Sequence, residues 1–194
     1  RKDREDDIKK CQAARDIIKQ VDWDCEVKTL FREKNLGCSV AVSSAIDWFF
    51  ENVEEGIILE DDCLPHITLF QFCHELLEKY RNDNRIMAIY GGNFQFGRKT
   101  TGHSYYFSRY PCICGWATWR RAWLYYDKEI KVWPEIKNKD YLKDILFHPT
   151  VIGYWSDIFQ KKYERKIDTW DYQWESYRLL HNQCNSIFCN HSSN

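Results

Sequence analysis

The sequence predicts an α/β fold in which helices flank a mostly parallel sheet. Two observations support this prediction. Apolar segments with the period of a helix alternate with short strand-type runs through the first half of the chain. The chain has 194 residues, enough for one domain with a sizeable core. Strands that are joined by crossover helices run parallel in such folds.

The first half is expected to alternate helix and strand three times. Helices are expected at 6–20, 39–50 and 65–80, and strands at 25–31, 56–60 and 86–90. The first helix places Ile8, Cys11 and Ala14 on one face. Pro65 suits the first turn of the third helix, where a missing N–H costs nothing.

The second half is less regular. A strand is expected at 105–109, a Trp-rich helix at 115–126, and further helices near 141–147, 154–163 and 172–180. The chain opens in a helical pattern and ends while still strand-like. We therefore expect residues 1–194 to form a single domain that is truncated at both ends, with its first strand missing.

Composition excludes several classes of protein. The net charge of −1 gives no broad basic surface, so no nucleic acid partner is expected. No segment approaches the roughly 18 apolar residues of a membrane span. The nine cysteines are odd in number and include no C-x-x-C pair, which favours reduced, mostly buried thiols in a reducing compartment over a disulfide framework. No clustered His and Cys residues indicate zinc.

Three adjacent acids follow the second predicted strand. Glu60, Asp61 and Asp62 come directly after the apolar run 57–59. Adjacent carboxylates repel one another, and Mg²⁺ or Mn²⁺ commonly joins one or two carboxylates to a substrate phosphate. The motif therefore predicts a divalent cation site, with a solvated acidic loop as the alternative.

Residues 34–37 follow the first predicted strand. Gly37 permits close approach of a phosphate or ribose to the backbone, and Lys34 supplies a positive charge for a phosphate. The alternative is a simple turn from strand to helix.

A glycine and three tryptophans mark residues 115–123. On a helix, Trp116, Trp119 and Trp123 would lie on one side, and Trp116 beside Gly115 would form the floor of a sugar site. The alternative is packing of the indoles in the core.

Two aspartates lie among tryptophans near the last predicted helix. Burial beside Trp170 and Trp174 would raise the pKa of Asp168 or Asp171 toward that of a general base. The alternative is that one of the two aspartates caps the last helix.

Taken in order, these segments resemble a nucleotide-diphospho-sugar glycosyltransferase of the GT-A fold. The resemblance rests on 35–37, 39–50, 57–62, 115–119 and 170–174. It is closest to a bacterial group labelled hemolysin-like, and the order of motifs is similar to that in the N-acetylglucosaminyltransferase I family. It implies a Rossmann-like, three-layer fold.

The resemblance also implies roles for residues. Asp62 would bind Mn²⁺ or Mg²⁺, Glu60 and Asp61 would face the sugar and ribose of the donor, and Asp171, with Asp168 as its rival, would be the base of an inverting transfer. The residues near the nucleotide would be Asn35 and Gly37, with Lys34 or Ser39. Gly115 and Trp116 would shape the pocket for donor sugar and acceptor.

The implied substrates are a nucleotide-sugar, UDP-sugar above all, and a glycan or lipid-linked acceptor, used in surface glycan synthesis. The parent protein would act in the cytoplasm at the inner face of a bacterial membrane, with peripheral membrane association, or in the Golgi lumen of a eukaryote. Two alternatives stay open: a sugar nucleotidyltransferase, and a non-catalytic carbohydrate-binding module of the same fold.

Overall fold

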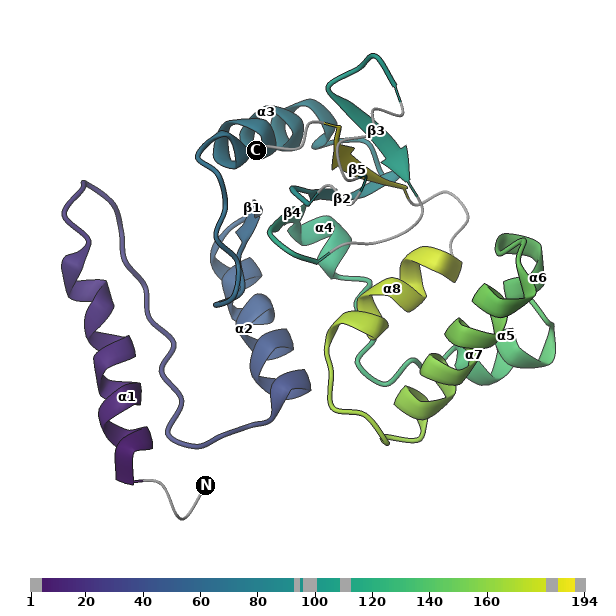
Figure 1. The fold of residues 1–194 in the computed structure, drawn as a ribbon, viewed down its shortest axis with the longest axis horizontal. Helices are drawn as coiled ribbons and strands as arrows, with labels where there is room; N and C mark the ends of the chain where they lie inside the picture. Colours follow the sequence, from purple (N-terminus) through teal and green to yellow (C-terminus); the bar gives the residue numbers. More distant parts are fainter. Residues whose placement is uncertain (1–4, 93–94, 96–100, 109–112, 181–184, 191–194) are drawn as a thin grey trace. The chain divides into compact units, whose positions relative to one another are not determined.

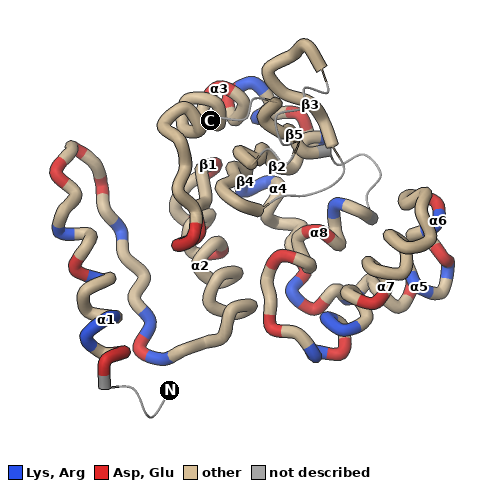
Figure 2. Tube along the Cα trace, in the orientation of Figure 1, with Lys and Arg blue, Asp and Glu red and all other residues tan. Residues whose placement is uncertain are grey.

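The computed structural model describes residues 5–92, 95, 101–108, 113–180 and 185–190 (Figure 1). The chain divides into two compact units, Arg1–Lys34 and Asn35–Asn194. Figure 2 shows Lys and Arg interspersed with Asp and Glu over the helices and loops of both units.

The first unit is a helix followed by an extended segment. Helix α1 (Glu5–Asp16) continues into a short 3₁₀ turn, η1 (Ile17–Gln20). The extended segment is held by Arg15, whose guanidinium donates to the Arg32 carbonyl at 3.0 Å and lies 5.1 Å from the Phe31 ring centroid. The strand expected at 25–31 is wrong, because none of these residues pairs with a described strand.

The second unit contains a five-stranded mixed sheet. In chain order the strands are β1 (Glu55–Ile58), β2 (Ile86–Tyr90), β3 (Tyr105–Ser108), β4 (Trp116–Trp119) and β5 (Asn185–Cys189). Their order in the sheet is β1-β4-β2-β5-β3, and only β2 and β5 pair in parallel. The α/β class is as predicted, whereas a mostly parallel sheet is not confirmed. The reason is that β4 lies antiparallel between β1 and β2, and that β3 pairs antiparallel with β5.

The strand directions still place three carboxyl ends at one edge. Because β1 and β2 both run antiparallel to β4, they share one direction, and β5 runs parallel to β2. The chain segments that follow β1, β2 and β5 therefore leave the sheet at the same edge.

The second unit contains seven helices among the described residues. They are α2 (Cys38–Asn52), α3 (Thr68–Tyr80), α4 (Arg120–Trp123), α5 (Trp133–Asn138), α6 (Leu142–Ile145), α7 (Pro149–Tyr163) and α8 (Asp171–Leu180). Most of the predicted helices are confirmed, although α3 begins three residues after Pro65. Helix α5 lies outside all of the predicted helix ranges.

The helix expected at 115–126 is wrong for its first half. Residues 116–119 form β4, which pairs with β1 and β2, and only 120–123 are helical. Aromatic and β-branched side chains favour strands, and this preference prevails where two neighbouring strands are available.

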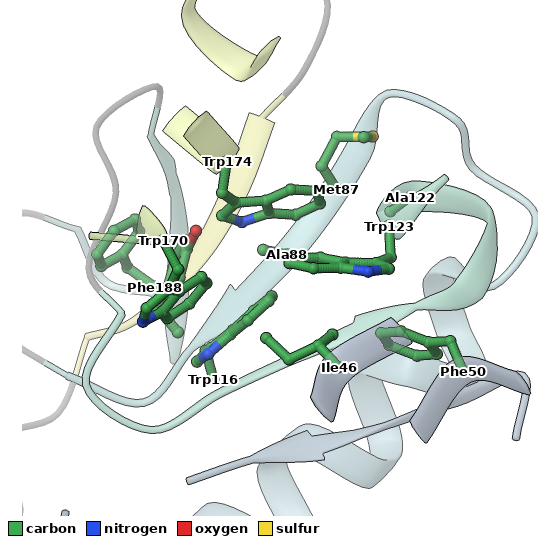
Figure 3. Close-up of a cluster of buried hydrophobic side chains, with 11 residues drawn as sticks. Ile46, Phe50, Met87, Ala88, Trp116, Ala122, Trp123, Trp170, Trp174 and Phe188 are labelled. Atoms are coloured by element: carbon green, nitrogen blue, oxygen red, sulfur yellow. The ribbon is translucent and has the colours of Figure 1, made fainter. Parts of the chain in front are cut away.

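Helices pack on both faces of the sheet. Helix α3 covers one face through Cys73, Leu76 and Leu77. The other face carries a cluster of tryptophans together with Ile46 and Phe50 of α2 (Figure 3). A further apolar cluster joins α5, α6, α7 and α8. The sheet thus lies between two apolar layers.

Two compositional expectations are resolved by the structure. Of the seven cysteines among the described residues, only Cys73 is buried, so the expectation of mostly buried thiols is wrong. Most of the others lie on helix ends and loops outside the core. No helix in the described ranges combines the length and apolar character needed to cross a membrane.

Candidate functional site

The three acids form a tight turn at the end of β1. The Cys63 amide donates to the Glu60 carbonyl at 3.0 Å, which closes the turn. The side chains of Asp61 and Asp62 are exposed. In the described part of the chain, Asp62 makes no ion pair, and its one hydrogen-bonding contact is with the Cys63 thiol at 3.7 Å.

A pocket of about 420 Å³ opens beside this turn. Its wall is formed by 62–66 after β1, 91–92 after β2, Cys189 at the end of β5, 114–115 before β4, and the start of α3. These are the carboxyl ends of the three strands that share one direction. Ligands bind at such strand ends in open α/β sheets.

Two glycines allow the backbone to close this pocket. The Gly91 amide donates to the Gly115 carbonyl at 2.9 Å, and a Cβ on Gly91 would lie 2.3 Å from the Leu69 side chain. Gly115 has φ 65°, a conformation that favours glycine. The predicted site residue Gly115 therefore lies in the pocket wall.

Trp116 lies in the core and not in the pocket wall. Its side chain is fully buried, and its ring stacks on Trp170 with centroids 5.8 Å apart and an 18° angle between the planes. Trp119 packs against the opposite face of the sheet, beneath α3. Alternation along β4 explains the separation of the two indoles, since neighbouring side chains of a strand face opposite sides. The expected common face of the three tryptophans is therefore wrong.

Asp168 binds the N-terminus of α2. Its carboxylate oxygens accept hydrogen bonds from the amides of Cys38 at 2.8 Å and Ser39 at 3.0 Å. These bonds lower the pKa of Asp168 below its usual range. The carboxylate thus satisfies two of the amides that a helix start leaves unpaired. Asp168 therefore caps a helix, as the alternative prediction held, but the helix that it caps is α2 and not α8.

The glycine before α2 is required by this contact. Gly37 has φ 77° and ψ 167°, and a Cβ there would lie 2.5 Å from Asp168 Oδ2. Asn35 Oδ1 accepts a hydrogen bond from the Gly37 amide at 2.8 Å. Lys34 is the last residue of the other unit, so its position relative to this turn is not described.

Asp171 is the first residue of α8, and its environment shifts its pKa in the opposite direction to that of Asp168. Burial raises the pKa of this carboxyl above its usual value, against the lowering effect of the nearby amides of Asp171 and Tyr172 and of the Lys162 charge. The Thr169 hydroxyl donates a hydrogen bond to its carboxylate. In catalytic sites, neighbouring carboxyls whose pKa values are shifted in opposite directions often have different acid–base roles. Asp171 fits a general base better than Asp168, whose oxygens are engaged by α2.

Trp170 connects this segment to the acidic turn. Its indole Nε1 donates to Glu60 Oε1 at 2.9 Å, and its carbonyl accepts from the Tyr126 hydroxyl at 3.0 Å. Glu60 therefore contacts the segment that carries Asp171, while Asp62 in the same turn lines the pocket. The structure thus brings the acidic turn together with the segment 168–171.

Ser39 and a lysine that sequence reasoning missed lie behind Asp168. The Ser39 hydroxyl is buried and accepts hydrogen bonds from Lys162 Nζ at 3.2 Å and Gln173 Nε2 at 3.3 Å. Both donors also reach the Thr169 carbonyl, at 2.7 and 2.8 Å. Lys162 belongs to no motif, and a lysine near the end of a helix usually indicates a solvated residue.

The side chains of the acidic turn have the chemistry that a divalent cation site needs. Among the described residues, no group of three or more His, Cys, Asp and Glu side chains is arranged to hold a metal ion. A cation held by one or two carboxylates and completed by substrate phosphates needs no such group. Asp62 offers an exposed carboxylate on the pocket wall, and Asp61 is exposed beside it. The residues present therefore fit a cation that is shared with a diphosphate.

Comparison of the chain with known protein families, curated proteins and solved structures finds no significant match.

Proposed function

We propose that this protein is an inverting, metal-dependent glycosyltransferase that uses a nucleotide-sugar donor. The observation that carries the proposal is the pocket at the carboxyl ends of β1, β2 and β5. Its wall includes Asp62, and the turn of Asp62 is joined through Glu60 and Trp170 to the segment of Asp171. In the finer classification we propose a GT-A fold, in line with the sequence resemblance.

The donor would occupy the pocket with its diphosphate toward Asp62. Asp62 would hold a divalent cation, which when bound would supply positive charge to neutralise the departing diphosphate. Glu60 is held in place by the Trp170 indole and would face the sugar and ribose. Gly91, Gly92 and Gly115 add no side chains of their own to the pocket wall that would hold the donor.

Asp171 would act as the general base. An acceptor hydroxyl attacks the anomeric carbon of the donor and gives its proton to the Asp171 carboxylate. A bond forms between the acceptor oxygen and the anomeric carbon, and the bond from that carbon to the phosphate oxygen breaks. The nucleoside diphosphate leaves with the electron pair. A pKa raised by burial suits a carboxylate to this task.

A transfer assay on the full-length protein tests the proposal. UDP-sugars and Mn²⁺ are supplied with glycan acceptors, and both transfer and donor hydrolysis are measured. We expect Asp171→Asn to lower the transfer rate about 100- to 10,000-fold without weakening donor binding. A wild-type protein that neither binds nor consumes any nucleotide-sugar would overturn the function, and an unimpaired Asp171→Asn variant would overturn the base assignment.

A further inference from the structure

Lys162 is a lysine buried inside the second unit. It lies near the end of α7, and only 8% of its surface is exposed. Its Nζ donates to Ser39 Oγ at 3.2 Å, to the Ile167 carbonyl at 3.4 Å and to the Thr169 carbonyl at 2.7 Å. A buried ammonium is costly unless its donors are satisfied and a negative charge lies near it. The three acceptors, all uncharged, account for its donors.

Two of the three opposite charges that act on Lys162 belong to the candidate site. Asp168, Glu129 and Asp171 stabilise its charged form, while Lys128 and burial oppose it. The pKa of Lys162 is lowered overall, with burial as the main cause. The hydrogen bonds of Lys162 tie the segment that leads into Asp171 to the start of α2, which indicates a structural role in the candidate site.

Other ionisable groups also interact electrostatically with Asp171. They are Cys38 at the start of α2, Glu175 on α8, Tyr126 after α4 and Tyr172 on α8. None of these four is a cation at neutral pH. Lys162 is the one cation whose charge acts on Asp171 among the described interactions.

We infer that Lys162 is a positioning residue for Asp171, because its ammonium joins the Ile167 and Thr169 carbonyls, just before Asp171, to Ser39 at the start of α2. The inference rests on the proposed function, in which Asp171 takes a proton from the acceptor. Two consequences follow. The ammonium holds the segment on which Asp171 depends, and it limits how far burial raises the proton affinity of that carboxyl.

Carboxyl carbon NMR of Asp171 against pH tests the inference without any substrate. We expect Lys162→Met to move the titration midpoint of Asp171 to higher pH, in the direction expected when a nearby cation is removed. Lys162→Arg keeps the charge and should leave the midpoint near its wild-type value. Lys143→Met, on the exposed surface of α6, is the matched control and should change nothing.

Transfer rates give a second readout, since the acid limb of the pH–rate profile should move with the NMR midpoint. If Lys162→Met does not fold, Lys162→Gln keeps a donor for the Thr169 carbonyl and should give the same shift. An unchanged Asp171 midpoint in the neutral variants would overturn the inference. Absence of transfer in the wild type would overturn the proposed function instead, and the NMR result would remain a separate measurement.

Discussion

The indole Nε1 of Trp170 donates to Glu60 Oε1 at 2.9 Å, across 110 positions of the chain. This hydrogen bond joins the acidic turn after β1 to the segment that begins α8. Trp170 is itself fixed by stacking on Trp116. The two halves of the candidate site therefore depend on one buried aromatic stack (Figure 3).

Replacing Trp170 should cost more stability than replacing its stacking partner. Trp170→Phe removes ring area and also the donor to Glu60, whereas Trp116→Phe removes ring area alone, because among the described residues the Trp116 indole N–H has no acceptor. We expect the free energy of unfolding to fall by about 1 kcal/mol more for Trp170→Phe, the value of one hydrogen bond. Urea unfolding of both variants measures the difference, and equal losses would contradict the structural role given to this bond.

Gly37 should not tolerate a side chain. Gly37→Ala places a Cβ 2.5 Å from Asp168 Oδ2 and forces alanine into a backbone region reserved for glycine. The backbone term alone predicts a loss of about 1–3 kcal/mol in unfolding free energy. Gly153→Ala in α7 is the matched control: its Cβ would meet nothing within 4 Å, so a gain of about 0.5–1 kcal/mol is expected. Thermal and urea unfolding of the two variants should move in opposite directions, and a stable Gly37→Ala protein would contradict this geometry.

The two hydrogen bonds from the start of α2 to the Asp168 carboxylate should make the free energy of unfolding depend on pH. The pKa of Asp168 is lowered in the folded protein, so its stabilising effect is present above the unfolded value near 3.9 and is lost as the pH falls through the folded pKa. Asp168→Asn should therefore lower the midpoint of urea unfolding at pH 6. It should have little effect at a pH below the folded pKa of Asp168, where the wild-type carboxyl is protonated. Asp144→Asn, an exposed residue of α6, serves as the control. A difference from wild type that does not change with pH would count against capping by the carboxylate.

A buried ion pair on α8 should show the opposite dependence on pH. Glu175 and Arg178 are almost fully buried, and Arg178 Nη1 lies 3.0 Å from Glu175 Oε2. Arg178 also donates to the Tyr90 hydroxyl at 2.8 Å. Burial raises the pKa of Glu175 to about 7. Arg178→Met would leave this carboxylate unpaired and should cost about 3–5 kcal/mol at pH 8.

The loss in Arg178→Met should be smaller at pH 5. A carboxyl with a raised pKa contributes stability that is present below the unfolded value near 4.3 and is lost as the pH rises through the folded pKa. At pH 5 the carboxyl is protonated in the variant and the buried charge disappears. The double variant with Glu175→Gln should recover stability at pH 8. Urea unfolding at both pH values measures this, and equal losses at pH 5 and pH 8 would contradict it.

Local sequence patterns predicted those helices and strands whose conformation depends mainly on the residues within them. The strand at 86–90 is found with its predicted bounds, and α2 and α8 begin within one residue of the predicted positions. The first half of the helix expected at 115–126 was wrong because Trp116 and Trp119 suit a strand as well as a helix, and the pairing with β1 and β2 on either side decides for the strand. Neighbouring strands are far away in sequence, so single-segment reasoning misses them.

The candidate site was predicted in part. Asp62 and Gly115 were named from the sequence and line one pocket, and Glu60 contacts the segment that carries Asp171. The position of Asp168 was not foreseen, since its partners at α2 lie about 130 residues earlier. Lys162 gave no signal at all, because its burial is produced by tertiary packing. Long-range contacts of this kind cannot be read from local spacing.

Calorimetry of the full-length protein with a UDP-sugar and Mn²⁺ tests the proposed function most directly. We expect wild-type protein to bind the donor only when the cation is present, Asp62→Ala to lose this metal-dependent binding, and the control Asp144→Ala to retain it. Donor affinity that is unchanged by Asp62→Ala, or the same with and without Mn²⁺, would contradict the account.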